Sequence, residues 1–241
     1  MLTLHQAARS HGIPNIGPPA LKVETWLRMN GIPYEVADFS FQDAPKGKAP
    51  YVTTEDGSRL GDSTFIIEYL KGRYGKDPDA QLTPAERGVS LAFRRMLKEN
   101  DYWVIMYSRY VVPQNWEAYR QSILQVVPAD WPDAQKQAVA DMMQKNIISQ
   151  MQGHGIFRHS MEEIFKLGIE DFTAVSDYLG DKPYFMGNEP TTVDATLYGF
   201  LVNVMDVPFG SPVRDFCLSR PNLVAYCRRM GDRYFPEFKK A

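Results

Sequence analysis

The chain has 241 residues, of which 44% are hydrophobic and 23% charged, close to the average for soluble globular proteins and unlike a disordered chain. Its 27 basic and 29 acidic residues give a formal charge of −2, so we expect no basic surface that would bind nucleic acid. No stretch approaches the ~20 apolar residues of a membrane-spanning helix, and the first residues do not resemble a secretory signal. The only cysteines, Cys217 and Cys227, form neither a disulfide scaffold nor a zinc site by themselves. We therefore expect a cytoplasmic protein with no metal site and with neither nucleic acid nor a membrane as partner.

The first 75 residues alternate between strand and helix patterns. Short runs of β-type residues predict strands, and Asp56-Gly57 predicts the tight turn of a hairpin. The predicted strands cover residues 2–5, 33–41, 50–54 and 58–60. Apolar residues at helical spacing predict two helices, over residues 20–30 and 63–74.

Beyond residue 75 the pattern becomes almost entirely helical. Three helix starts carry a side chain that can cap the helix and an acidic residue three positions later, namely Thr83-Pro84-Ala85-Glu86, Ser160-Met161-Glu162-Glu163 and Thr191-Thr192-Val193-Asp194. We expect a small α/β domain over residues 1–75, a linker over 76–82 and an all-helical domain over 83–241. Residues 113–132 are expected to form an aromatic loop, either a lid or a packed insertion.

Two neighbouring segments of the first domain have the chemistry of a peptide-binding site. A proline that opens a strand after Lys46-Gly47-Lys48-Ala49 is a plausible site for a cis bond between Ala49 and Pro50. The backbone of Ala49 would then face outward and pair with a peptide-like ligand. Pro50 is also compatible with an ordinary edge strand.

The second segment is Gly61-Asp62-Ser63-Thr64, directly before a predicted helix. Free amides at a helix N-terminus, with the Ser63 hydroxyl beside them, bind carboxylates well. Asp62 would accept a hydrogen bond from an ammonium group of the same ligand. The simpler interpretation is that Ser63 only caps the helix.

The first domain is expected to contain, in order, a loop and helix, a strand, a strand opened by Ala49-Pro50, a hairpin, and a helix after Asp62-Ser63. This order resembles the thioredoxin-like domain of glutathione transferases. The resemblance implies that Ala49, before the cis-Pro50, pairs with the cysteinyl backbone of glutathione. It implies that Asp62 and Ser63 hold the γ-glutamyl end, and that Lys46 or Lys48 meets the glycine carboxylate. It also implies that glutathione is a co-substrate and that the protein forms a homodimer.

A closer resemblance is to the failed-axon-connections and metaxin-like branch of that superfamily. It extends over the whole chain, in the segments Leu21 to Met29, Ala44 to Lys48, Gly61 to Ile66, Glu99 to Trp103, Arg158 to Ser160 and Val193 to Gly199. Metaxins act in import at the mitochondrial outer membrane, and the lack of an apolar anchor segment argues against that role here.

The position expected to activate the thiol departs from the family pattern. Serine- and cysteine-type transferases carry the activating residue five positions before the Lys-Val pair, where this chain has Gly17. Tyrosine-type enzymes use a tyrosine at the end of the first strand, where Gln6 stands. A free thiol has a pKa of about 8.5, so a transferase must favour the thiolate. We hypothesise that backbone amides around Gly17, helped by Asn15 or Ser10, do so.

Trp103 and Tyr107, with Tyr102 beside them, are candidates to line a pocket for a hydrophobic electrophile, although aromatic stripes at helical spacing are more often core. His154 and His159 are five residues apart and lack the companions of a metal site. Two functions remain. One is a glutathione transferase that conjugates glutathione to a small hydrophobic electrophile, and the other is a non-catalytic binding or interaction module of the same fold.

Overall fold

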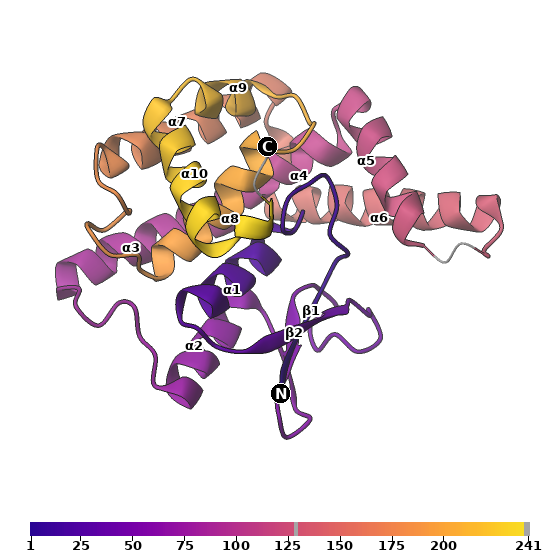
Figure 1. Cartoon of the computed structure of the whole chain (residues 1–241). Coiled ribbons are helices and arrows are strands. Elements are labelled where there is room, and N and C mark those ends of the chain that lie inside the picture. Colours follow the sequence, from indigo (N-terminus) through magenta and orange to yellow (C-terminus); the bar gives the residue numbers. More distant parts are fainter. Residues whose placement is uncertain (128–129, 239–241) are drawn as a thin grey trace.

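The computed structural model describes residues 1–127 and 130–238, and it begins with a four-stranded sheet and two helices (Figure 1). The elements of this N-terminal region are β1 (Leu2–Gln6), α1 (Pro18–Met29), β2 (Tyr34–Asp38), β3 (Tyr51–Thr53), β4 (Arg59–Gly61) and α2 (Ser63–Tyr74). The strand order is β2-β1-β3-β4, with β1 parallel to β2 and β3 antiparallel to both β1 and β4. The predicted thioredoxin-like arrangement is confirmed.

The core of this region lies between the sheet and the two helices. β1 alternates between buried and half-buried residues, so that one of its faces carries Leu2 and Leu4 into the core. Trp26 from α1 and Ile66 from α2 complete the same apolar cluster. The sheet therefore fixes the ends of β1 and β3, from which the candidate site is built.

The rest of the described chain is helical. Its elements are α3 (Pro84–Met96), η1 (Leu97–Asp101, a π-helix), α4 (Tyr102–Tyr110), α5 (Pro113–Val126), α6 (Asp133–His154), η2 (Ile156–Arg158), α7 (Met161–Leu179), α8 (Thr192–Met205), α9 (Pro212–Leu218), α10 (Pro221–Tyr234) and η3 (Pro236–Phe238). The three predicted capping boxes are present at the starts of α3, α7 and α8. Each satisfies two backbone amides that the helix itself leaves unpaired.

Helix α8 joins the helical region to the first one. All fourteen of its residues are buried, and it packs along α1 (Figure 1). The contact is closest at Gly199, where a Cβ atom would lie 2.9 Å from the Pro18 carbonyl oxygen and 3.1 Å from the Lys22 nitrogen. Only glycine allows the two helices to approach this closely, so α8 sets the position of α1.

The prediction of a loop over residues 113–132 is wrong for most of that segment. Pro113 occupies the first turn of α5, where a missing N–H costs nothing, and the helix then runs to Val126. Trp116 and Tyr119, three residues apart, both pack against Tyr110, with ring centroids 5.5 and 5.1 Å away. The segment is a packed helix, and residues 128 and 129 lie outside the described part.

Candidate active site

The first part of the candidate site is the turn before β3. The bond between Ala49 and Pro50 is cis, as predicted. Pro50 is buried, whereas Ala49 is exposed and precedes the first paired residue of β3. In the described part of the chain the backbone of Ala49 has no hydrogen-bond partner. An extended peptide can therefore pair with it.

The second part is the start of α2. Asp62 is the N-cap of this helix, since its Oδ1 accepts a hydrogen bond from the Thr64 amide at 2.8 Å. The structure thus corrects the interpretation in which Ser63 is the cap: Ser63 is the first helical residue and is 97% buried. Asp62 has φ of 77°, a conformation that is uncommon for non-glycine residues, although aspartate adopts it more readily than most.

The second carboxylate oxygen of Asp62 faces the helical region. Its Oδ2 lies 3.0 Å from Nζ of Lys98, which projects from η1. Burial opposes ionisation of Asp62, but the Thr64 amide and the Lys98 ammonium outweigh it and hold the pKa of the carboxyl below its usual value. This aspartate is therefore charged at neutral pH and can receive an ammonium group.

Lys22, which was not among the residues predicted for the site, lies directly behind the same helix start. Its side chain is only 3% exposed, and Nζ lies 3.2 Å from Ser63 Oγ and 3.4 Å from Thr64 Oγ1. Burial, followed by the charges of Arg94 and Lys98, lowers the pKa of Lys22 to about 7. A signal was available, because Pro18, Lys22 and Trp26 form one row along α1 in which the lysine stands between two apolar residues.

The start of α1 differs, because most of its backbone donors are already used or missing. The Gly17 amide donates to Asn15 Oδ1 at 2.8 Å, and Pro18 and Pro19 have no N–H. Asn15 is fully buried and donates to the Ala7 carbonyl at 2.9 Å. The Asn15 side chain and the Gly17 amide thus hold the loop in shape, because both are used in hydrogen bonds within the protein.

Ser10 keeps a free hydroxyl in the same loop. Its carbonyl accepts a hydrogen bond from Ile13, while its hydroxyl has no partner within the described residues. The side chain is half-buried. Of the three side chains or positions predicted to activate the thiol, Ser10 has the hydroxyl that no described residue uses, and its role stays a prediction.

The lysines of the turn contact different elements. Lys48 Nζ donates to Gln150 Oε1 of α6 at 2.7 Å, so it bridges the turn and the helical region. Lys46 Nζ lies 4.3 Å from the centre of the Phe65 ring. The geometry leaves both lysines as candidates for the glycine carboxylate.

The three aromatic residues predicted to line a substrate pocket lie in two different environments. Trp103 contacts Tyr102, with ring centroids 5.0 Å apart, and His154 of α6 at 5.2 Å. Tyr107 instead packs against Phe157 and Phe165 in the helical core. Trp103 and Tyr102 are half-buried, whereas Tyr107 is 9% exposed and belongs to the core.

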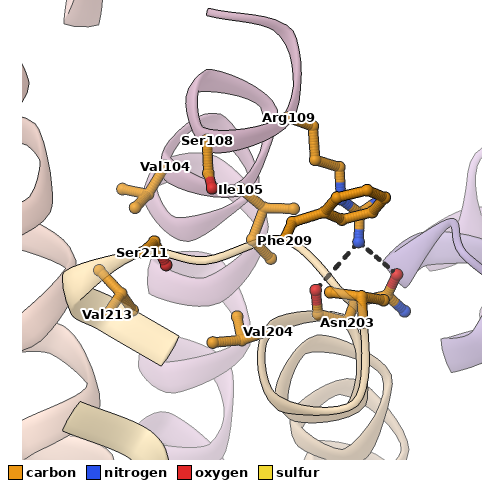
Figure 2. Close-up of a pocket in the computed structure, with 10 residues that line it drawn as sticks. Val104, Ile105, Ser108, Arg109, Asn203, Val204, Phe209, Ser211 and Val213 are labelled. Carbon is orange, nitrogen blue, oxygen red and sulfur yellow. Dashed lines mark hydrogen bonds between the residues drawn. The ribbon is translucent and has the colours of Figure 1, made fainter. Parts of the chain in front are cut away.

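A buried arginine on α4 supports the loop before α1. Arg109 donates to the Ile16 carbonyl at 2.6 Å, and Figure 2 shows its two bonds to the backbone and side-chain oxygens of Asn203. The adjoining cavity, lined by Val104 and Phe209 among others, has a volume of about 20 Å³. That volume suits a water molecule, so this cavity is not a substrate pocket.

The described residues contain no group of three or more His, Cys, Asp or Glu side chains that could hold a metal ion. His154 contacts Trp103, and His159 lies 3.7 Å from Glu163 at the start of α7. Within residues 1–127 and 130–238, no helix is long and apolar enough to cross a bilayer.

Solved structures of other proteins share this fold. A β-etherase from Sphingobium sp. strain SYK-6 superposes with a TM-score of 0.65 at 18% identity, covering 98% of both chains. Glutathione transferase F7 from Populus trichocarpa gives a TM-score of 0.62 at 12% identity, covering 99% of this chain and 97% of its own. At these identities the likeness establishes the fold alone.

Sequence comparisons establish the family. Residues 18–115 match the glutathione S-transferase N-terminal domain, and residues 168–230 match the glutathione S-transferase C-terminal domain. Isoprene-epoxide–glutathione S-transferase from Rhodococcus sp. (strain AD45) is 34% identical, over 97% of this chain and 99% of its own length.

Two further relatives place the chain within the family. Failed axon connections from Drosophila melanogaster is 32% identical over 99% of this chain, which spans 59% of the Drosophila protein. Metaxin-1 from Mus musculus is 25% identical over 93% of this chain and 72% of its own. The chain belongs to the glutathione S-transferase superfamily, in the branch that includes Failed axon connections and metaxin-1.

Proposed function

We propose that this protein is a glutathione transferase that conjugates glutathione to a small hydrophobic electrophile. The observation that carries the proposal is the exposed, unpaired backbone of Ala49, joined by a cis bond to Pro50, in the same region as the charged start of α2. A tripeptide with a carboxylate and an ammonium group at one end matches both features. The relative from Rhodococcus supports the activity, because its name describes a glutathione transferase that acts on an epoxide.

Glutathione would lie across the two features. Its cysteinyl backbone pairs with Ala49, and its γ-glutamyl carboxylate meets the amide and hydroxyl of Ser63. Its ammonium group meets Asp62 Oδ2, in place of or beside Lys98, which lies 3.0 Å from that oxygen. Lys46 or Lys48 receives the glycine carboxylate.

The electrophile would approach the thiol from the helical region. Half-buried Trp103 and Tyr102 offer the apolar surface there. With an epoxide, the sulfur–carbon bond forms as the ring carbon–oxygen bond breaks, and the alkoxide takes a proton from water. Holding the thiolate against the ring carbon lowers the barrier. The Ser10 hydroxyl is the donor we assign to the thiolate.

Calorimetric titration of glutathione into wild type and Ser63→Ala tests the binding site. The variant should bind at least fivefold more weakly, the scale of one hydrogen bond to a charged group, about 1 kcal/mol or more. Ser149→Ala is the control, because this serine is exposed on α6 and makes no side-chain hydrogen bond in the described structure. If wild type does not bind glutathione at millimolar concentration, the proposal fails.

A second candidate function is a binding or interaction module without transferase chemistry. It is favoured by the start of α1, where Gly17 has no side-chain donor and Pro18 and Pro19 have no amide hydrogen. An assay with glutathione and a simple terminal epoxide separates the two functions. Turnover that Ser10→Ala reduces supports the transferase, and glutathione binding without turnover supports the module.

We further propose a homodimer formed through α2 and α3. Phe65 and Tyr69 on α2 and Leu91 on α3 expose 36–51% of their surface, and burial of such side chains favours association. Light scattering after gel filtration should give twice the chain mass for wild type and a larger monomer fraction for Phe65→Ser. A wild-type monomer at all concentrations would exclude the dimer.

We propose a cytoplasmic location as well. Cys217 and Cys227 are both buried free thiols, which a reducing compartment preserves. Fractionation of cells that express the protein at native level tests this, and recovery in a membrane fraction would contradict it.

A further inference from the structure

The Lys22 amine is buried without a carboxylate in contact. Lys22 is 97% buried, and its only hydrogen bonds in the described structure go to the hydroxyl oxygens of Ser63 and Thr64. The acid that faces Lys22 is Asp62, whose two carboxylate oxygens already have other partners. Its Oδ2 accepts from Lys98, and its Oδ1 accepts from the Thr64 amide. A buried charge usually has an ionic partner, and this one has none within contact.

The elements packed around Lys22 supply more positive than negative charge. Arg94 and Arg95 face it from α3 and Lys98 from η1, while Asp62 is the acid that faces it from α2. Arg95 and Lys98 are themselves paired in part with Glu99, at 3.3 and 3.8 Å. Helix α8 has one charged residue, Asp194, and its carboxylate bonds to Thr191, Phe185 and Tyr226 rather than to Lys22. Glu24 on α1 is held by Gln6, Arg9, Arg28 and Tyr34.

The hydrogen bonds also orient Ser63 when Lys22 is charged. A charged ammonium group only donates, so in this state Ser63 Oγ accepts from Lys22, and its own hydrogen is left for another acceptor. The amide of Ser63 stands at the same helix start, where the helix dipole favours negative charge. One carboxylate placed there would receive the hydroxyl and the amide and would supply the missing negative charge.

We propose that Lys22 is a positioning residue for the γ-glutamyl carboxylate of glutathione, and that binding of this carboxylate is coupled to uptake of a proton by Lys22. The inference rests on the proposed function. In the free protein the Lys22 amine is neutral in a substantial fraction of molecules at neutral pH, because burial and its cationic neighbours lower its pKa to about 7. The bound carboxylate stabilises the charged form, and the amine takes a proton from solvent.

Calorimetry in buffers of different ionisation enthalpy measures the protons taken up. The probe is S-methylglutathione, whose blocked thiol cannot release a proton of its own. At pH 8 wild type should take up about half a proton or more beyond Lys22→Met, and at pH 6 this difference should vanish, since Lys22 is then already charged. The affinity of wild type should fall up to tenfold per pH unit above pH 7 relative to Lys22→Met.

Two variants separate charge from structure. Lys22→Arg keeps a permanent charge, so it should bind S-methylglutathione with no such pH dependence and no proton uptake at this site. Lys166→Met is the matched control, because the Lys166 side chain is 74% exposed on α7. This variant should match wild type in proton uptake and in affinity for S-methylglutathione. The ¹³Cε resonance of Lys22 reports its ionisation directly and should titrate near pH 7 in the free protein and higher with the probe bound.

S-Methylcysteinylglycine, which lacks the γ-glutamyl group, should cause no proton uptake. Equal uptake by wild type and Lys22→Met, or a Lys22 resonance that titrates only above pH 9, overturns the inference and leaves the proposed function intact. Failure of wild type to bind glutathione or S-methylglutathione overturns both.

Discussion

The starts of α1 and α2 are two helix N-termini in the same region of the molecule, and they are built in opposite ways. At α2, Asp62 caps the helix, while Ser63 and the buried Lys22 leave the site short of negative charge. At α1, Gly17 donates to Asn15, and two prolines remove the next amides. The first is suited to receive an anion, and the second offers a thiolate little beyond the helix dipole. The two helix starts thus offer different chemistry to an anionic ligand.

The largest effect should come from removing the support of the α1 loop. Arg109→Leu leaves the Ile16 carbonyl and both oxygens of Asn203 without their donor in a buried site. We expect the free energy of unfolding to fall by about 3 kcal/mol, because each buried acceptor left unpaired costs about 1–3 kcal/mol. Urea denaturation measures this. Arg59→Leu, which breaks an exposed pair with Asp43, should cost less than about 1 kcal/mol, and a similar loss for both variants would contradict the assigned support.

Lys22, behind the start of α2, should make the free energy of unfolding depend on pH. The folded pKa of Lys22, about 7, lies below that of an unfolded lysine, so between pH 7 and about 10 the unfolded state binds more protons. Lys22 therefore destabilises the fold most at and below pH 7, and this penalty shrinks as pH rises, by at most about 1.4 kcal/mol per unit. The stability difference between Lys22→Met and wild type, from denaturation curves at pH 7, 8 and 9, should decrease accordingly. A constant difference would show that Lys22 titrates normally.

The charge of Asp62 can be removed while its cap is kept. Asp62→Asn retains an oxygen for the Thr64 amide, and asparagine tolerates the positive φ. We expect glutathione to bind about tenfold more weakly, since the ammonium group loses a charged acceptor, a change of about 1.4 kcal/mol. Titration calorimetry measures this loss, with thermal unfolding as the check on the fold. Unchanged affinity would place the ammonium group elsewhere.

The smallest expected effect is a gain in turnover from a hydroxyl added at the start of α1. Gly17→Ser adds a hydroxyl at the position where the resemblance to serine-type transferases predicts the activating residue, and its Cβ would lie 3.1 Å from Asn15 Oδ1, which requires a small adjustment. If α1 lacks a donor, turnover of an epoxide should rise several-fold, with glutathione affinity nearly unchanged. Steady-state kinetics at saturating glutathione test this. Equal kcat in both proteins would indicate that Ser10 or another group already activates the thiol.

The fold was predictable because its signals are local. Asp56-Gly57, the capping residues Thr83, Ser160 and Thr191, and the residue order around Pro50 each determine structure within a few positions. Residues 113–132 misled because prolines are typical of turns and loops, whereas here Pro113 begins a helix and the aromatic rings pack against α4.

The site was only partly predictable because its decisive contacts join distant segments. Lys22 meets Ser63 across 41 positions, and Arg109 meets Ile16 across 93. Periodicity identifies a buried row on a helix, but it does not say which hydroxyl or carbonyl lies opposite. The burial of Asn15 likewise depends on how the loop folds back to Ala7.

The close approach of Gly199 to Pro18 and Lys22 has a consequence for how the molecule comes apart. Because α8 is buried along its whole length and lies against α1, the thioredoxin-like region and the helical region bury apolar surface against each other. Melting of either region strips apolar surface from the other, so both should be lost in one cooperative transition. A fragment ending near residue 82 would expose the apolar surface of α1 that α8 covers and should aggregate. An insertion at Gly199 would disrupt the contact between α1 and α8 that joins the two regions.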